Sequence, residues 1–231
     1  MKLLGVETSS PVFSVAVSDG PNILSCLKIG GMGRPSALLT EMIKEVLAHA
    51  GLELAQVDGF AISIGPGSFT GLRVGVTTVK TLSWALKKSV LPVSSLEAIA
   101  HNASVHGSVV PFVDARKGKV YTALFSRDSS GAVKRLTEDL LLLPADALKK
   151  IARKKAIKVK TLLMGDGIRR YADLLSALKE KVDLAPEPFW IPCAESICRI
   201  AAGSWPKGVV DDPHRLVPQY LYSKESDITG W

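Results

Sequence analysis

Two turns rich in glycine and hydroxyl residues are the segments of this sequence that could contact a phosphate. The first, Glu7-Thr-Ser-Ser10, follows an apolar run, and the second, Gly65-Pro-Gly-Ser-Phe-Thr-Gly71, leads into a helical pattern. Glycines at a helix start leave backbone N–H groups accessible, and the helix dipole favours an anion there. The residues predicted to contact a nucleotide phosphate are therefore Glu7, Thr8, Ser9, Ser10, Gly65, Gly67 and Ser68.

The same residues could equally serve the backbone alone. Gly65 and Gly67 suit a sharp turn, and Ser68 or Thr70 could cap the helix that follows. Hydroxyl groups next to a strand end often bond to nearby backbone atoms instead of a ligand. No lysine follows the glycines at the spacing of a P-loop, so that motif is excluded.

Metal and acid–base chemistry have little support in the sequence. No two histidines are four residues apart, and the closest pair, His101 and His106, would point about 140° apart on a helix. The carboxylates of Glu7, Asp114 and Asp166 are too isolated in sequence to be paired as acid and base. We therefore expect no metal site and no catalytic residue.

The elements that must position these turns alternate between strand and helix signals. Strands are expected at 3–8, 13–18, 23–29, 59–64, 90–93, 109–113, 120–125, 133–143 and 158–164. Helices are expected at 36–50, 70–86, 96–103, 144–152, 168–178 and 194–203, and the proline-rich segment 185–192 should be extended. Both halves begin with strands, which predicts a duplicated α/β lobe at 1–104 and 105–231, the last helix packing back on the first lobe.

The helix at 70–86 has two apolar faces. Leu72, Val76, Val79 and Leu86 suit the core of the lobe, whereas a stripe of small residues lies on a second face. Such a stripe lets another backbone approach closely, although the helix could instead be sandwiched inside its own lobe. The predicted partner interface comprises Gly71, Val74, Gly75, Thr78, Leu82, Leu39 and Met42. On this hypothesis, Gly75→Leu would disrupt association and leave the fold intact.

The net charge of +7 is concentrated in one segment. The run 149–160 holds six lysines, one arginine and no acidic residue, so the rest of the chain is neutral. Such a run could hold RNA by releasing counterions from phosphates, or it could be a solvated helix end.

No apolar run reaches the roughly 18 residues of a membrane span, and an early carboxylate at Glu7 does not suit a signal peptide. We therefore expect a cytoplasmic protein. Its three cysteines contain no Cys-x-x-Cys pair and are interpreted as buried thiols: Cys26, Cys193 and Cys198.

Several of these segments together resemble the TsaB (YeaZ) family. They are Glu7-Thr-Ser-Ser10, Ser14-Val-Ala-Val17, 65–73, Ser95-Leu-Glu97, and Asp114-Ala-Arg116 with Val120-Tyr121. The resemblance implies an actin-like ATPase (ribonuclease H-like) fold with two small lobes of mixed sheet and flanking helices. It also implies a non-catalytic scaffold subunit for making threonylcarbamoyladenosine next to the anticodon of transfer RNA.

The partners implied by the resemblance are the metal-bearing catalytic homologue TsaD, the ATPase TsaE, a second copy of the chain, and transfer RNA reached through the complex. No cofactor is implied except ATP or ADP at the complex interface. A different reading is a stand-alone phosphotransferase or nucleotide hydrolase that uses the Glu7 and Gly65 turns. Asp114-Ala-Arg116 lacks the glycine of a second phosphate-binding turn, whereas Gly165-Asp-Gly167 leaves that reading open.

Overall fold

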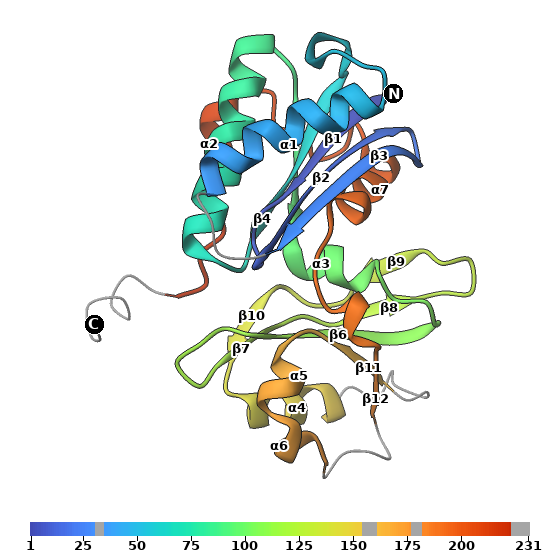
Figure 1. Cartoon of the computed structure of the whole chain (residues 1–231). Coiled ribbons are helices and arrows are strands. Elements are labelled where there is room, and N and C mark those ends of the chain that lie inside the picture. The colour runs from blue at the N-terminus through green and yellow to red at the C-terminus, as the bar shows by residue number, and fades with distance from the viewer. Residues whose placement is uncertain (31–34, 154–160, 177–181, 223–231) are drawn as a thin grey trace. The chain divides into compact units, whose positions relative to one another are not determined.

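The computed structural model describes residues 1–30, 35–153, 161–176 and 182–222 (Figure 1). The chain forms two compact units. The first combines Met1–Ala98 with Pro192–Gln219, and the second begins at Ile99, runs to Ile191 and resumes at Tyr220. The division thus lies a few residues before the predicted boundary at 104, and the whole segment 192–219 returns to the first unit.

The first unit contains a five-stranded mixed sheet with the order β3-β2-β1-β4-β5. The strands are β1 (Lys2–Glu7), β2 (Val12–Asp19), β3 (Asn22–Gly30), β4 (Gly59–Gly65) and β5 (Val90–Ser94). The first three run antiparallel, and β4 and β5 run parallel to β1. The central strand β1 is almost wholly buried because helices cover both faces of the sheet, which explains its continuous apolar sequence.

Three helices cover this sheet: α1 (Pro35–His49), α2 (Phe69–Leu86) and α7 (Ala194–Ser204). The first two lie on one face and α7 lies on the other (Figure 1). Alternate residues of β1 serve the two cores, since Leu4 and Val6 pack with the α1 and α2 side whereas Leu3 packs with Ile197 of α7. Helix α7 therefore packs on the sheet of the first unit. The short elements of this unit are η1 (Leu54–Gln56), the start of α3 (Ser95–Ala100) and η3 (Pro213–Arg215).

The second unit contains a seven-stranded sheet that repeats the same plan. Its strands are β6 (Gly107–Asp114), β7 (Val120–Thr122), β8 (Phe125–Arg127), β9 (Val133–Arg135), β10 (Leu140–Leu142), β11 (Thr161–Met164) and β12 (Val182–Leu184). The order β10-β7-β6-β11-β12 has the same strand directions as the first sheet, and the β8–β9 hairpin is added beside β6. The predicted α/β architecture, with two lobes of mixed sheet and flanking helices, is confirmed.

Helices α4 (Pro144–Arg153), α5 (Gly167–Arg170) and α6 (Ala172–Ser176) contribute to the core of this second sheet. Phe112, Leu163 and Ile168 are among the buried residues of that core. A 3₁₀ turn, η2 (Glu187–Phe189), precedes α7. Within the described ranges, no helix has both the length and the apolar character that a bilayer crossing needs.

Several predicted elements of the second half are corrected. The strand expected at 120–125 is divided because β7 pairs with the last residues of β6 whereas β8 pairs with its first residues. The segment 133–143 is likewise two strands, 168–176 holds two short helices, β12 was missed, and the segment 185–192 contains a 3₁₀ turn. Of the basic run 149–160, the residues 154–160 lie outside the described residues.

Candidate functional site

The small-residue face of α2 packs against the turn that follows β1 in the same unit. An added Cβ at Gly71 would lie 1.9 Å from the carbonyl oxygen of Thr8, and one at Gly75 would lie 2.1 Å from the Thr8 hydroxyl. One at Gly67 would lie 2.3 Å from the carbonyl oxygen of Ser9. These separations are far shorter than van der Waals contact, so only glycine lets the helix approach the turn this closely. This face of α2 is therefore buried within its own lobe.

That packing corrects four of the residues predicted to contact a partner. Gly71 and Gly75 are buried against the turn. Leu39 and Met42 of α1 are 0% and 1% exposed because their side chains fill the core. The expectation that Gly75→Leu leaves the fold intact is also corrected, since a leucine there would collide with Thr8.

The opposite side of α2 carries two large exposed aromatic side chains. Phe69 is 49% exposed and Trp84 is 68% exposed. The guanidinium carbon of Arg73 lies 3.8 Å from the centroid of the Phe69 ring. The predicted interface residues that keep partial exposure are Val74, Thr78 and Leu82. Large aromatic side chains are enriched at protein–protein interfaces relative to the rest of a protein surface.

The turn after β1 has almost no surface that a phosphate could reach. Glu7 and Thr8 are 0% exposed and Ser9 is 6% exposed. The Ser10 hydroxyl donates to the carbonyl oxygen of Val12 at 2.9 Å. The predicted phosphate contacts of Glu7, Thr8 and Ser9 are therefore corrected, and the hydroxyl of Ser10 serves the local backbone instead.

The turn after β4 also serves the fold. The backbone N–H of Ser68 donates to the carbonyl oxygen of Ser9 at 2.7 Å, and the Ser68 hydroxyl accepts from the N–H of Gly71 at 3.2 Å. Ser68 thus caps α2. Gly65 has a φ of 108°, which favours glycine, and a Cβ there would lie 3.0 Å from the carbonyl oxygen of Gln219. These contacts of Ser68 and Gly65 therefore hold the start of α2 against the first unit.

Three buried oxygen atoms near the ends of β1 and β4 have no hydrogen-bond partner among the described residues: Glu7 Oε2, Thr8 Oγ1 and Ser63 Oγ. The other oxygen of Glu7 accepts from the backbone N–H of Ser9. Burial raises the pKa of the Glu7 carboxyl above its ordinary value, and Ser9 and Ser63 oppose only part of this effect. Compared with a solvent-exposed glutamate, Glu7 in the folded protein is therefore shifted toward its protonated form.

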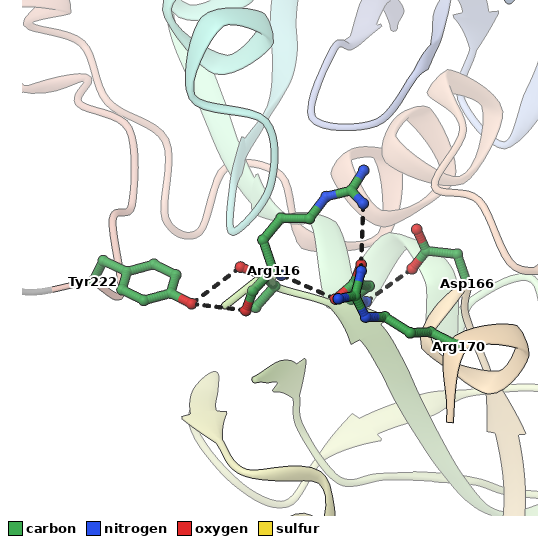
Figure 2. Close-up of polar contacts among 6 residues, drawn as sticks. Arg116, Asp166, Arg170 and Tyr222 are labelled. Atoms are coloured by element: carbon green, nitrogen blue, oxygen red, sulfur yellow. Dashed lines mark hydrogen bonds and ion pairs between the residues drawn. The ribbon is translucent and has the colours of Figure 1, made fainter. Parts of the chain in front are cut away.

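The second unit joins two turns that are far apart in sequence (Figure 2). Asp166 Oδ1 accepts from the backbone N–H of Asp114 at 2.9 Å. The Asp114 carboxylate accepts from the backbone N–H of Arg116 at 3.0 Å and lies 3.3 Å from Arg116 Nη1 and 3.2 Å from Arg170 Nη1. Its side chain is only 6% exposed, so the two guanidinium groups supply the compensation that a buried carboxylate needs.

Gly165 and Gly167 let this turn pack closely on β6. An added Cβ at either glycine would lie 2.6 Å from the carbonyl oxygen of Phe112, and Gly165 has a φ of 125°. These glycines therefore serve packing. Their surroundings give no support to the reading that Gly165-Asp-Gly167 binds the phosphate of ATP.

Sequence reasoning missed Arg170 and Tyr222. Arg170 meets Asp114 across 56 residues, and the Tyr222 hydroxyl lies 3.1 Å from the carbonyl oxygens of Ala115 and Arg116 across more than 100 residues. No local spacing connects residues so far apart, and only the fold brings them to one place.

The thiols are free and differ in burial. Cys198 is buried, whereas Cys26 and Cys193 are partly exposed, which corrects the prediction that all three are buried. Burial raises the pKa of the Cys198 thiol to about 12. Burial, together with the nearby Glu195 carboxylate, raises the pKa of Cys26 to about 12.

In the part of the chain that the structure describes, no three His, Cys, Asp or Glu side chains gather as metal ligands.

A cavity of about 400 Å³ opens in the second unit among residues 102–108, β11 and residues 183–189. Its lining includes Asn102, Leu162 and Phe189. None of the residues predicted to bind a phosphate or a partner lines it, and neither does the Asp114 ion-pair cluster. The cavity is therefore separate from both turns.

Comparison with known proteins agrees with this fold. A family model described as TsaD, tRNA N6-adenosine threonylcarbamoyltransferase, matches residues 35–198. The tRNA threonylcarbamoyladenosine biosynthesis protein TsaB of Buchnera aphidicola subsp. Schizaphis graminum is 31% identical over 173 residues, which are 73% of this chain and 80% of that protein. The Escherichia coli (strain K12) protein of the same name is 25% identical over 224 residues, or 96% and 94% of the two chains. The solved structure of YeaZ from Pseudomonas aeruginosa has a TM-score of 0.77 at 26% identity and covers 95% of this chain and 99% of its own. The chain therefore belongs to the TsaB (YeaZ) family.

Proposed function

We propose that this protein is a non-catalytic subunit needed to form threonylcarbamoyladenosine on the adenosine beside the anticodon of transfer RNA. The names of its relatives support the pathway, since curated proteins similar to most of the chain are called tRNA threonylcarbamoyladenosine biosynthesis protein TsaB. The match to the TsaD model supports a pairing with a catalytic homologue of similar fold. In this role the chain would act as scaffold and activator.

Burial of the first turn supports a role without catalysis. Glu7 and Thr8 are 0% exposed, and Thr8 lies against Gly71 and Gly75 of α2. This burial supports the proposal that the turn does not act as the phosphate-contacting turn of actin-like ATPases. A stand-alone phosphotransferase or nucleotide hydrolase has less support, because both of its expected turns are used for packing. ATP or ADP would then bind only where a partner adds residues at a shared interface.

The main support for the scaffold role is the exposure of aromatic side chains on the outer face of α2. Trp84 and Phe69 expose large aromatic surfaces on a helix whose inner face is closed by its own unit. Large aromatic side chains supply much of the binding energy at protein interfaces. This face would pair with the TsaD-type homologue and, in its absence, with a second copy of the chain.

The remaining partners follow from the family. The ATPase TsaE would act on the assembled pair, and transfer RNA would be reached through the complex. These reactions would take place in the cytoplasm. In this proposal the metal ion belongs to the catalytic homologue.

We expect Trp84→Asp to weaken association with the catalytic homologue at least about tenfold, because removal of a central interface tryptophan commonly costs 2 kcal/mol or more. Association is measured by titration calorimetry and by light scattering after gel filtration. Threonylcarbamoyladenosine formation in a reaction with the homologue and the ATPase should fall in parallel at low protein concentration. The thermal midpoint of the variant alone should stay close to that of the unchanged chain, since the side chain is 68% exposed.

Leu143→Asp is the matched control, because Leu143 is 54% exposed and lies in the second unit between β10 and α4. It makes the same kind of change without touching α2, so association should be retained. Equal affinity of the Trp84→Asp and Leu143→Asp variants for the homologue would show that α2 is not the pairing surface.

A further inference from the structure

Two arginine side chains form ion pairs with the Asp114 carboxylate and remain largely exposed to solvent. The side chain of Arg116 is 78% exposed and that of Arg170 is 49% exposed, although each has a nitrogen within 3.3 Å of the same carboxylate oxygen. A guanidinium group has five N–H donors in a fixed plane, so one contact with Asp114 leaves the group able to donate elsewhere. Figure 2 shows both side chains converging on this carboxylate from different elements.

The tip that carries Arg116 has an unusual backbone. Arg116 and Lys117 have φ values of 62° and 48°, and Gly118 follows at 73°. The left-handed conformation costs about 1–2 kcal/mol for a residue with a side chain. The Tyr222 hydroxyl shares its proton between the carbonyl oxygens of Ala115 and Arg116, which helps to hold the tip.

Further cations surround the same tyrosine. Lys117 Nζ lies 5.7 Å and Lys119 Nζ lies 5.4 Å from the centroid of the Tyr222 ring. Together with Arg116 and Arg170, four cationic side chains gather here. Among the described residues, the carboxylates with hydrogen bonds or ion pairs to these turns include Asp114 and Asp166.

We propose that this cluster, formed by Arg116, Lys117, Lys119 and Arg170, contacts the phosphodiester backbone of a folded RNA directly. The proposal rests on the proposed function, in which the substrate is transfer RNA, and adds a contact made by this chain itself. Arginine binds phosphate oxygens through two parallel N–H groups, and Asp114 holds both guanidinium planes in place before binding. Asp114 acts here as a positioning residue.

An RNA fits this cluster better than a free nucleotide or an acidic protein surface. The cations are spread over a hairpin tip and α5, and the cavity of about 400 Å³ in the second unit is lined by other residues. A polyanion with regularly spaced phosphates matches several separate cations at once. An acidic protein partner would instead require a carboxylate placed opposite each cation. Binding of the catalytic homologue by the variants distinguishes this alternative from RNA.

The test compares Arg116→Gln/Arg170→Gln with Arg169→Gln, using an unmodified transfer RNA transcript as the probe in fluorescence anisotropy. Arg169 neighbours Arg170 on α5, is 69% exposed and pairs with Glu187, so it controls for loss of charge and for folding. The double variant should bind the RNA about tenfold more weakly near 100 mM salt. Its plot of log affinity against log salt should be shallower by about 1.5, because two phosphate contacts are lost. Arg169→Gln should change both quantities much less.

The Asp114→Asn variant tests whether RNA binding depends on how Asp114 positions the two arginines or only on the net charge of the cluster. The variant gains one unit of positive charge but loses the anchor of both guanidinium groups, so we expect weaker RNA binding. Tighter binding would overturn the positioning role of Asp114. Equal losses in the double variant and in Arg169→Gln, or no loss in either, would overturn the RNA contact itself.

The measurements are made on the chain alone and on its complex with the catalytic homologue. If the double variant assembles and supports modification but its RNA affinity is unchanged, this proposal fails and the proposed function stands. If its RNA affinity is unchanged and the homologue no longer binds, the cluster is a protein contact. If the unchanged chain neither binds the homologue nor supports modification, the proposed function fails, and RNA binding by the chain alone still decides the present proposal. No detectable RNA binding by either form of the unchanged protein would overturn it.

Discussion

Gly71→Ala is expected to destabilise the first unit by about 3 kcal/mol or more, or to prevent its folding. The added Cβ would lie 1.9 Å from the carbonyl oxygen of Thr8, a backbone atom that cannot rotate away. Relief would require α2 to move off the turn after β1. Urea unfolding followed by circular dichroism measures the effect, because α2 is the longest helix of this unit among the described residues.

Alanine substitutions at two other glycines test the same packing. Gly75→Ala should cost less than Gly71→Ala, because its close neighbour is the Thr8 hydroxyl, a side-chain atom that can turn away. Gly203→Ala in α7 is the matched control, since nothing lies within 4 Å of its added Cβ. That change should be neutral or stabilise by up to about 1 kcal/mol, as expected for alanine in a helix. Equal stability of the Gly71→Ala and Gly203→Ala variants would contradict the packing of α2 on the turn.

The neighbour of the small-residue face of α2 could not be predicted from the spacing of its glycines alone. The four-residue spacing of Gly71 and Gly75 indicated a close backbone approach, but spacing alone does not tell whether the neighbour is another chain. A signal was nevertheless present. Because β1 and β4 are adjacent and parallel, their carboxyl ends meet at one edge of the sheet, and the turn after β1 must lie beside the start of α2. Pairing these two strands first would have placed Thr8 under the stripe.

The long helices and buried strands could be predicted from the sequence, whereas the short elements of the second unit were harder to predict. The pattern of α1 and α2 repeats over four or more turns, so their periodicity was clear. The strands β7 to β10 contain three residues each, and so short a run shows no periodicity. The ion pairs at Asp114 depend on Arg170, which no local pattern connects to it. The site of the second unit therefore required the fold.

Glu7→Gln is expected to stabilise the first unit, and more so as the pH rises. Burial raises the pKa of Glu7, so between its ordinary pKa and the raised value the folded state binds more protons than the unfolded chain. The free energy of unfolding of the unchanged protein must then fall as the pH rises through this range. Glutamine keeps an oxygen to accept from the N–H of Ser9 and carries no charge. The thermal midpoint of Glu7→Gln minus that of the unchanged protein should therefore be larger at pH 8 than at pH 5.

Glu195→Gln should have the opposite sign and serves as the control. Burial alone would raise the pKa of Glu195, but the Lys28 ammonium group at 2.8 Å outweighs burial and the pKa is lowered. Its contribution to stability is present above the ordinary glutamate pKa and is lost as the pH falls through the lowered value. Removing this charge should therefore lower the thermal midpoint at pH 7, whereas removing the charge of Glu7 raises it. A Glu7→Gln difference that does not change with pH would mean that Glu7 titrates normally, and the turn beneath α2 would then have to be open to water.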